Sequence, residues 1–126
     1  MNYPELMSEL ARRLQLSTAA PGASGHCALR FDDVVVHFTH VPGAKALDLY
    51  AALGHVDLRD PAAQESLRLA REHTSLLHCE PTGELSLRQR FHLQAMAFPP
   101  FFKALERFIN LADHWRLQFA SARGPR

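Results

Sequence analysis

The sequence predicts an α+β domain in which helices pack on an antiparallel, twisted sheet. Apolar residues recur every three or four positions near both ends of the chain, which is typical of amphipathic helices. Residues 26–53 instead form three short runs in which apolar and polar side chains alternate, which is typical of half-buried strands. Short turns join these runs, and short turns favour antiparallel neighbours because a parallel crossover needs a long connection.

Three helices are predicted from spacing and capping residues. In residues 4–16, leucines recur at every fourth position and Asn2 is placed to cap the first turn. A middle helix is predicted over residues 61–73, with Asp60 as its cap. A last helix is predicted to end near residue 121 and to lie across the sheet. We assign its main apolar positions to the core: Phe101, Leu105, Phe108, Trp115 and Phe119.

Five strands complete the predicted order α-β-β-β-α-β-β-α. Asp32 and Asp33 are expected to form the turn between the first two strands. Clusters of glycine and proline, with serine or threonine beside some of them, mark loops elsewhere, including residues 17–25. The predicted strands are residues 26–31, 34–40, 46–53, 75–79 and 84–94.

The length, charge and hydropathy of the chain limit the classes of function that it can have. The chain has 126 residues, which predicts one domain over residues 1–126, with residues 121–126 as a frayed tail. It carries 14 Lys and Arg against 13 Asp and Glu, so its net charge does not favour nucleic acid. No apolar run approaches the ~20 residues that cross a bilayer, and no signal peptide is evident. We therefore expect a cytoplasmic protein that does not insert into membranes.

No motif predicts catalysis, a metal site or a cofactor. The eight histidines form no HExxH helix and no zinc-spaced pair with Cys27 or Cys79. No GxSxG turn and no glycine-rich phosphate loop occurs. The stripe of Arg88, Arg90 and His92 is interpreted as a solvated strand face. The surplus of apolar residues and the edges of the sheet instead favour binding of another polypeptide by strand addition.

Four stretches resemble one known family. They are residues 6–16 (LMSELARRLQL), 27–38 (CALRFDDVVVHF), 47–53 (LDLYAAL) and 101–117 (FFKALERFINLADHWRL). In this order they are similar to the class I type III secretion chaperones, the Tir chaperone or CesT-like family. The resemblance implies a non-enzymatic homodimer that binds the N-terminal segment of a secreted effector in extended form and supports virulence. The ATPase of the secretion apparatus is a further candidate partner, and nucleic acid is not.

Two sets of site residues follow as expectations. We expect an effector-binding groove with apolar residues from the first helix and the second strand, although one face of each element must also supply core: Leu6, Leu10, Leu14, Val34, Val36 and Phe38. We expect the dimer interface in the middle of the chain, where residues 65–79 depart from the family pattern: Leu67, Leu69, Leu76 and Leu77.

Two alternatives stay open at this point. One is a small ligand-binding or enzymatic α+β domain with a pocket lined by histidine and arginine. The other is an adaptor that binds a folded partner.

Overall fold

The computed structural model describes residues 1–15 and 25–122 and has three helices and five strands in that part of the chain. The predicted α+β class and order of elements are confirmed. The helices are α1 (Tyr3–Arg13), α2 (Pro61–His73) and α3 (Phe98–Ala122). The strands are β1 (His26–Phe31), β2 (Val34–Val41), β3 (Ala46–His55), β4 (Leu77–Cys79) and β5 (Glu84–His92).

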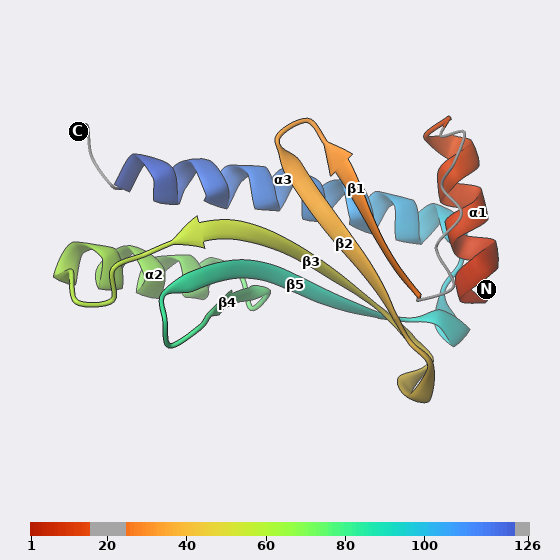
Figure 1. The fold of residues 1–126 in the computed structure, drawn as a ribbon, viewed down its shortest axis with the longest axis horizontal. Helices are drawn as coiled ribbons and strands as arrows, with labels where there is room; N and C mark the ends of the chain where they lie inside the picture. Colours follow the sequence, from red (N-terminus) through yellow and green to blue (C-terminus); the bar gives the residue numbers. More distant parts are fainter. Residues whose placement is uncertain (16–24, 123–126) are drawn as a thin grey trace.

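The strands form one antiparallel sheet in the order β1-β2-β3-β5-β4. The sheet is twisted, so that β1 and β2 cross the direction of β3 and β5 (Figure 1). Helix α3 runs along one face of the sheet, with α1 beside its first turns and α2 beside its last turns (Figure 1). The opposite face of the sheet carries no described helix.

Helix starts agree with the capping residues in the sequence. The Asn2 side chain accepts a hydrogen bond from the backbone N–H of Glu5 at 2.9 Å. The Asp60 side chain accepts one from the N–H of Ala62 at 3.0 Å. Each bond satisfies a donor that the first helical turn leaves unpaired, which is why these two helices begin where they do.

Several element ends differ from the predicted ends. β4 begins two residues late, because the Thr74 side chain accepts a hydrogen bond from the N–H of Leu76 and holds a turn there. β3 continues to His55 through a bulge between Ala52 and Gly54. β5 gives way to a 3-10 turn after His92. α1 ends at Arg13, and residue 16 of the predicted helix, the loop at 17–24 and tail residues 123–126 lie outside the described residues.

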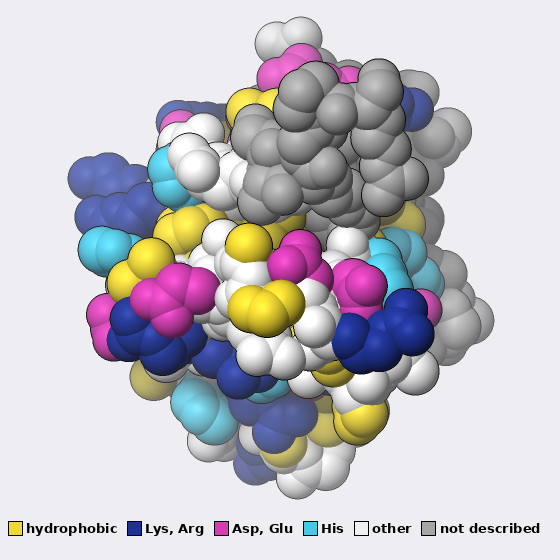
Figure 2. Space-filling model, turned by 90° about the vertical axis from the view of Figure 1, so that its left-hand side faces the viewer, with side chains coloured by type: hydrophobic (Ala, Val, Ile, Leu, Met, Phe, Trp, Pro, Cys, Tyr) yellow, Lys and Arg dark blue, Asp and Glu magenta, His cyan; other side chains and the backbone are white. Residues whose placement is uncertain are grey.

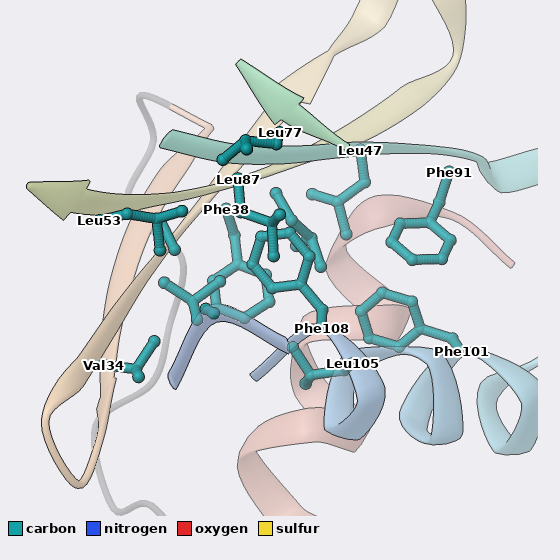
Figure 3. Close-up of a cluster of buried hydrophobic side chains, with 14 of the residues drawn as sticks. Val34, Phe38, Leu47, Leu53, Leu77, Leu87, Phe91, Phe101, Leu105 and Phe108 are labelled. Carbon is teal, nitrogen blue, oxygen red and sulfur yellow. The ribbon is translucent and has the colours of Figure 1, made fainter. Parts of the chain in front are cut away.

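The core lies between the sheet and α3. Figure 3 shows side chains of β2, β3 and β5 meeting Phe101, Leu105 and Phe108 of the helix. Phe119 is also buried, as predicted. Trp115, predicted to be core, is only half-buried, because it faces α2, with the His73 ring 6.3 Å away, where the helix passes the end of the sheet.

Gly83 supports the turn before β5 and is expected to be intolerant of a side chain. Its φ is +96°, and a Cβ there would lie 2.2 Å from the backbone oxygen of Val56. Gly83→Ala is therefore expected to lower the free energy of unfolding by about 1–3 kcal/mol. Gly43→Ala is the matched control, since a Cβ there meets nothing within 4 Å. Urea denaturation measures both, and equal stabilities would contradict this role of Gly83.

Candidate polypeptide-binding site

Strand β1 is one edge of the sheet, and among the described residues it pairs with β2 alone. The N–H of His40 donates to the carbonyl of Gly25 at 2.8 Å, just before β1 begins. Because bonded and non-bonded pairs alternate along an antiparallel ladder, every second residue after Gly25 directs its backbone groups to β2. The residues between them direct theirs to the open edge, and these are His26, Ala28 and Arg30.

The side chains of β1 on the helix side of the sheet are less covered than those of its neighbour. Cys27, Leu29 and Phe31 are half-buried, whereas Val36 and Phe38 on β2 are fully buried. The core thus thins toward this edge and leaves apolar surface open. Three more half-buried apolar side chains pack against the same core from α1 and α3. We call the whole set the apolar strip: Leu14, Cys27, Leu29, Phe31, Phe102 and Ile109.

The strip is uncharged along its length and has cations at its margins. Burial raises the pKa of the Cys27 thiol, so this side chain stays protonated near neutral pH and acts as a small apolar group. The Arg13 guanidinium lies 5.2 Å from the centre of the Phe102 ring. Arg116 of α3 lies 3.8 Å from Asp33 in the β1–β2 turn. The first contact joins α1 to α3, and the second joins α3 to the β1–β2 turn.

The residues predicted to line an effector groove lie mostly beneath this surface. Five of the six are at most 5% exposed, and only Leu14 is half-buried and belongs to the strip. The sequence analysis also allowed this outcome, because one face of each periodic element must supply the core. A bound chain would contact the strip first, and the binding role of the buried five stays a prediction: Leu6, Leu10, Val34, Val36 and Phe38.

Sequence reasoning did not single out Cys27, Leu29 and Phe31 as candidate binding residues. Their alternation was evident, but their incomplete burial depends on β1 being the outermost strand. The available signal was the place of this strand in the chain, since the first strand of a meander has a sequence neighbour on one side only. That signal favours an edge position, but a strand later in the chain can still pair with the first strand and cover its edge.

The four predicted dimer residues differ in how far they are exposed. Leu67 and Leu77 are buried, Leu76 is half-buried, and Leu69 is 45% exposed. Leu69 borders a pocket of about 430 Å³ between α2 and α3. Figure 2 shows apolar side chains exposed among charged ones on the side of the molecule where α2 lies. We call this pocket and its lining the α2–α3 face: Ser66, Leu69, Ala70, His73, Trp115, Gln118 and Phe119.

The Trp115 indole adds a polar requirement to the α2–α3 face. Its Nε1 is buried and has no hydrogen-bond partner among the described residues. A buried donor without an acceptor is costly, so a partner that brings an acceptor to this face would be favoured.

The outer face of the sheet holds a broad hollow of about 550 Å³ lined by histidine and arginine. This is the surface that a small-ligand function would use. Its arginines already have partners: Arg90 donates to both oxygens of Asp48 at 2.7 and 2.9 Å, and Arg88 lies 5.1 Å from the centre of the Tyr50 ring. Among residues 1–15 and 25–122, no group of three or more His, Cys, Asp or Glu side chains is placed to hold a metal ion.

A helix that crosses a bilayer must be both long and apolar, and the described part of the chain has three helices. None of the three is both long and apolar enough to cross a membrane.

The family comparison decides the class of protein. The model of the Tir chaperone protein (CesT) family matches residues 5–116 of this chain. The chain belongs to this family. The family predicted from the four sequence stretches is therefore confirmed, and so is the general function of an effector-binding chaperone of type III secretion. No curated protein sequence matches the chain.

Solved structures share the fold of this Tir chaperone family member. A chain in the crystal structure of the ExsC–ExsE complex aligns with a TM-score of 0.71 and 22% identity, covering 92% of this chain and 95% of that one. The Yersinia pestis type III secretion chaperone SycH, in complex with a fragment of YscM2, aligns with a TM-score of 0.69 and 18% identity, over 90% and 99%. A chain of the HopA1–SchA chaperone–effector complex aligns with a TM-score of 0.69 and 14% identity, covering 89% of this chain and 91% of that one.

Proposed function

We propose that this chaperone holds the N-terminal segment of a secreted effector in extended form along β1. The observation that carries the proposal is the combination on one strand of an open backbone edge and a half-buried apolar row. Strand addition supplies main-chain hydrogen bonds, and the apolar strip supplies sites for alternate side chains of the bound segment. The complexes of chaperones with effectors or partner fragments among the structures of similar fold support the same proposal.

The length of β1 limits what one edge can hold. Its six residues correspond to about 20 Å of extended chain, so the bound segment pairs over about six residues. Roughly every second side chain of that segment would face the strip. The mechanism is mass action: a segment that is disordered when free gains order on the chaperone and keeps its apolar residues away from other chains.

We also propose that the protein acts as a homodimer through the α2–α3 face. A second copy would cover Leu69, which is exposed in the protomer, and would pack near Trp115, whose indole N–H has no partner among the described residues. A symmetric pair of such faces makes a closed assembly, which is the commonest arrangement of soluble oligomers. Light scattering should give twice the 14.2 kDa of the protomer, and a protomer mass would contradict the dimer.

The remaining parts of the proposal concern where the protein works. We expect it in the bacterial cytoplasm, binding its effector before export, without catalysis and without a cofactor. Delivery to the ATPase of the secretion apparatus is the expected next step. Co-purification from the native cytoplasm tests the whole proposal. One larger secreted protein bound through its N-terminal region is expected, and recovery of the chain alone at native abundance would contradict it.

Ala28→Pro is expected to weaken effector binding while leaving the sheet intact. Proline removes the N–H that Ala28 directs to the open edge, and it does not touch the bonds to β2. We expect binding of the co-purified protein's N-terminal segment to weaken at least about tenfold. Ala28→Thr is the control, because it keeps the N–H and suits a strand. Calorimetric titration measures both, and equal affinities would contradict strand addition at this edge.

A further inference from the structure

Another concave surface lies at the start of α1, away from the apolar strip and the α2–α3 face. It has a volume of about 380 Å³ and lies between the first residues of the chain, the β2–β3 turn and the end of β5. Tyr3, Pro4, Pro42 and Leu93 give it an apolar lining. We call it the N-terminal hollow.

One wall of the hollow is a rigid aromatic pair. The Tyr3 and His40 rings stack with centroids 4.6 Å apart and planes 6° from parallel. Tyr3 is 5% exposed, and its hydroxyl is buried without a partner among the described residues. Burial raises the pKa of this hydroxyl, so the ring stays neutral. A wall that is already ordered loses little entropy when a side chain packs against it.

Lys45 stands at the rim in a backbone conformation that lysine seldom adopts. Its φ is 48°, in the left-handed region, which costs a residue with a Cβ about 1–2 kcal/mol. Hydrogen bonds hold it there: its N–H donates to the Pro42 carbonyl at 3.1 Å, and its carbonyl accepts from the Leu93 N–H at 3.0 Å. Glycine would meet the backbone requirement without strain, so the turn itself does not require lysine.

The residues that line the hollow include a cation and no anion. Lys45 forms no ion pair with the described residues, and no carboxylate is among the residues that line the hollow. His40 lies beside the same space. An apolar floor under a free ammonium group complements an apolar side chain that has a carboxylate next to it.

The hollow lies at the end of the sheet where β1, the edge proposed to bind the effector, begins. His40, which forms its aromatic wall, donates its N–H to the carbonyl of Gly25 immediately before β1. A chain that pairs along the edge of β1 and extends past His26 therefore continues toward the hollow.

We propose that the N-terminal hollow is an anchor pocket for an apolar side chain, of leucine or phenylalanine size, flanked by an acidic residue in the bound polypeptide. This inference rests on the proposed chaperone function, because it takes the bound polypeptide to be the effector. The pocket adds selectivity to that function, because main-chain pairing on β1 accepts many sequences whereas the hollow selects an acidic one.

Short synthetic peptides test the pocket without a known effector. The probes are acetylated, amidated Gly-Asp-Leu-Asp-Gly, its Lys-Leu-Lys counterpart and its Asp-Ala-Asp counterpart, followed by amide shifts of the ¹⁵N-labelled full chain at low salt. We expect the Asp-Leu-Asp peptide to shift the Gly43, Lys45 and Leu93 resonances and to bind about threefold tighter than the Lys-flanked one. Shifts elsewhere, or equal binding of all three peptides, would overturn the proposal.

Two variants of Lys45 separate the effect of its side-chain charge on peptide binding from the effect of its backbone conformation. Lys45→Glu is expected to reverse the preference between the two leucine peptides. Lys45→Gly keeps the left-handed turn and is expected to weaken the preference, with folding preserved. If both variants keep the wild-type preference, the anchor pocket is wrong. The chaperone proposal would still stand in that case, since it is tested independently by Ala28→Pro on the β1 edge.

Discussion

Replacing Phe38 with alanine is expected to lower the free energy of unfolding by about 3–5 kcal/mol. Phe38 is fully buried on β2, and Figure 3 shows it close to Phe108 and Leu105 of α3. Its removal would leave a cavity where the sheet and the helix meet, and neighbouring side chains refill such a cavity only in part. For a domain of this size the loss is a large share of total stability. Urea denaturation measures it.

Val35→Ala is the matched control for this prediction. Val35 is adjacent on the same strand but 42% exposed on the outer face, so its truncation should change stability by less than about 0.5 kcal/mol. The pair of variants also separates the two interpretations of Phe38. If Phe38→Ala kept its stability and lost effector binding, the side chain would belong to a groove and not to the core.

Leu69→Asp is expected to convert the dimer into monomers. Leu69 is exposed in the protomer, so the change should leave the fold intact. In the proposed dimer it would place an unpaired carboxylate in each half of a buried apolar interface, and burying such a charge costs several kcal/mol. We therefore expect the dimer dissociation constant to rise more than about a hundredfold. Sedimentation velocity at micromolar concentration measures it.

Arg71→Asp on the same helix serves as the control. It makes a similar substitution about 200° round α2 from Leu69, outside the lining of the α2–α3 pocket. This variant should remain dimeric. If both variants stayed dimeric, or if both dissociated, the second copy would not be seated on the α2–α3 face.

The fold could be predicted largely because its signals are local. Caps at Asn2 and Asp60, the turn at Asp32 and the alternation of Val34, Val36 and Phe38 each depend on a few neighbouring residues. The errors occur where distant parts of the chain meet. The position of Trp115 depends on how far α3 passes beyond the sheet, and no sequence period reports that.

The binding surface was less predictable for the same reason. Leu10 and Leu29 look alike as apolar members of a periodic pattern, yet one is sealed in the core and the other is half-open. The difference comes from the order of strands, which places β1 at the edge. Lys45 and Tyr3 gave no signal in sequence, because the hollow between them forms from three separate segments.

Titration calorimetry of the effector's N-terminal segment at several temperatures tests the extended binding of that segment most directly. Coupled ordering and burial of the segment along β1 should give a clearly negative heat-capacity change of binding, on the order of −0.2 kcal/mol/K. Ala28→Pro should reduce the affinity in the same experiment. A heat-capacity change near zero, with tight binding that Ala28→Pro leaves unaltered, would contradict an extended segment held along β1.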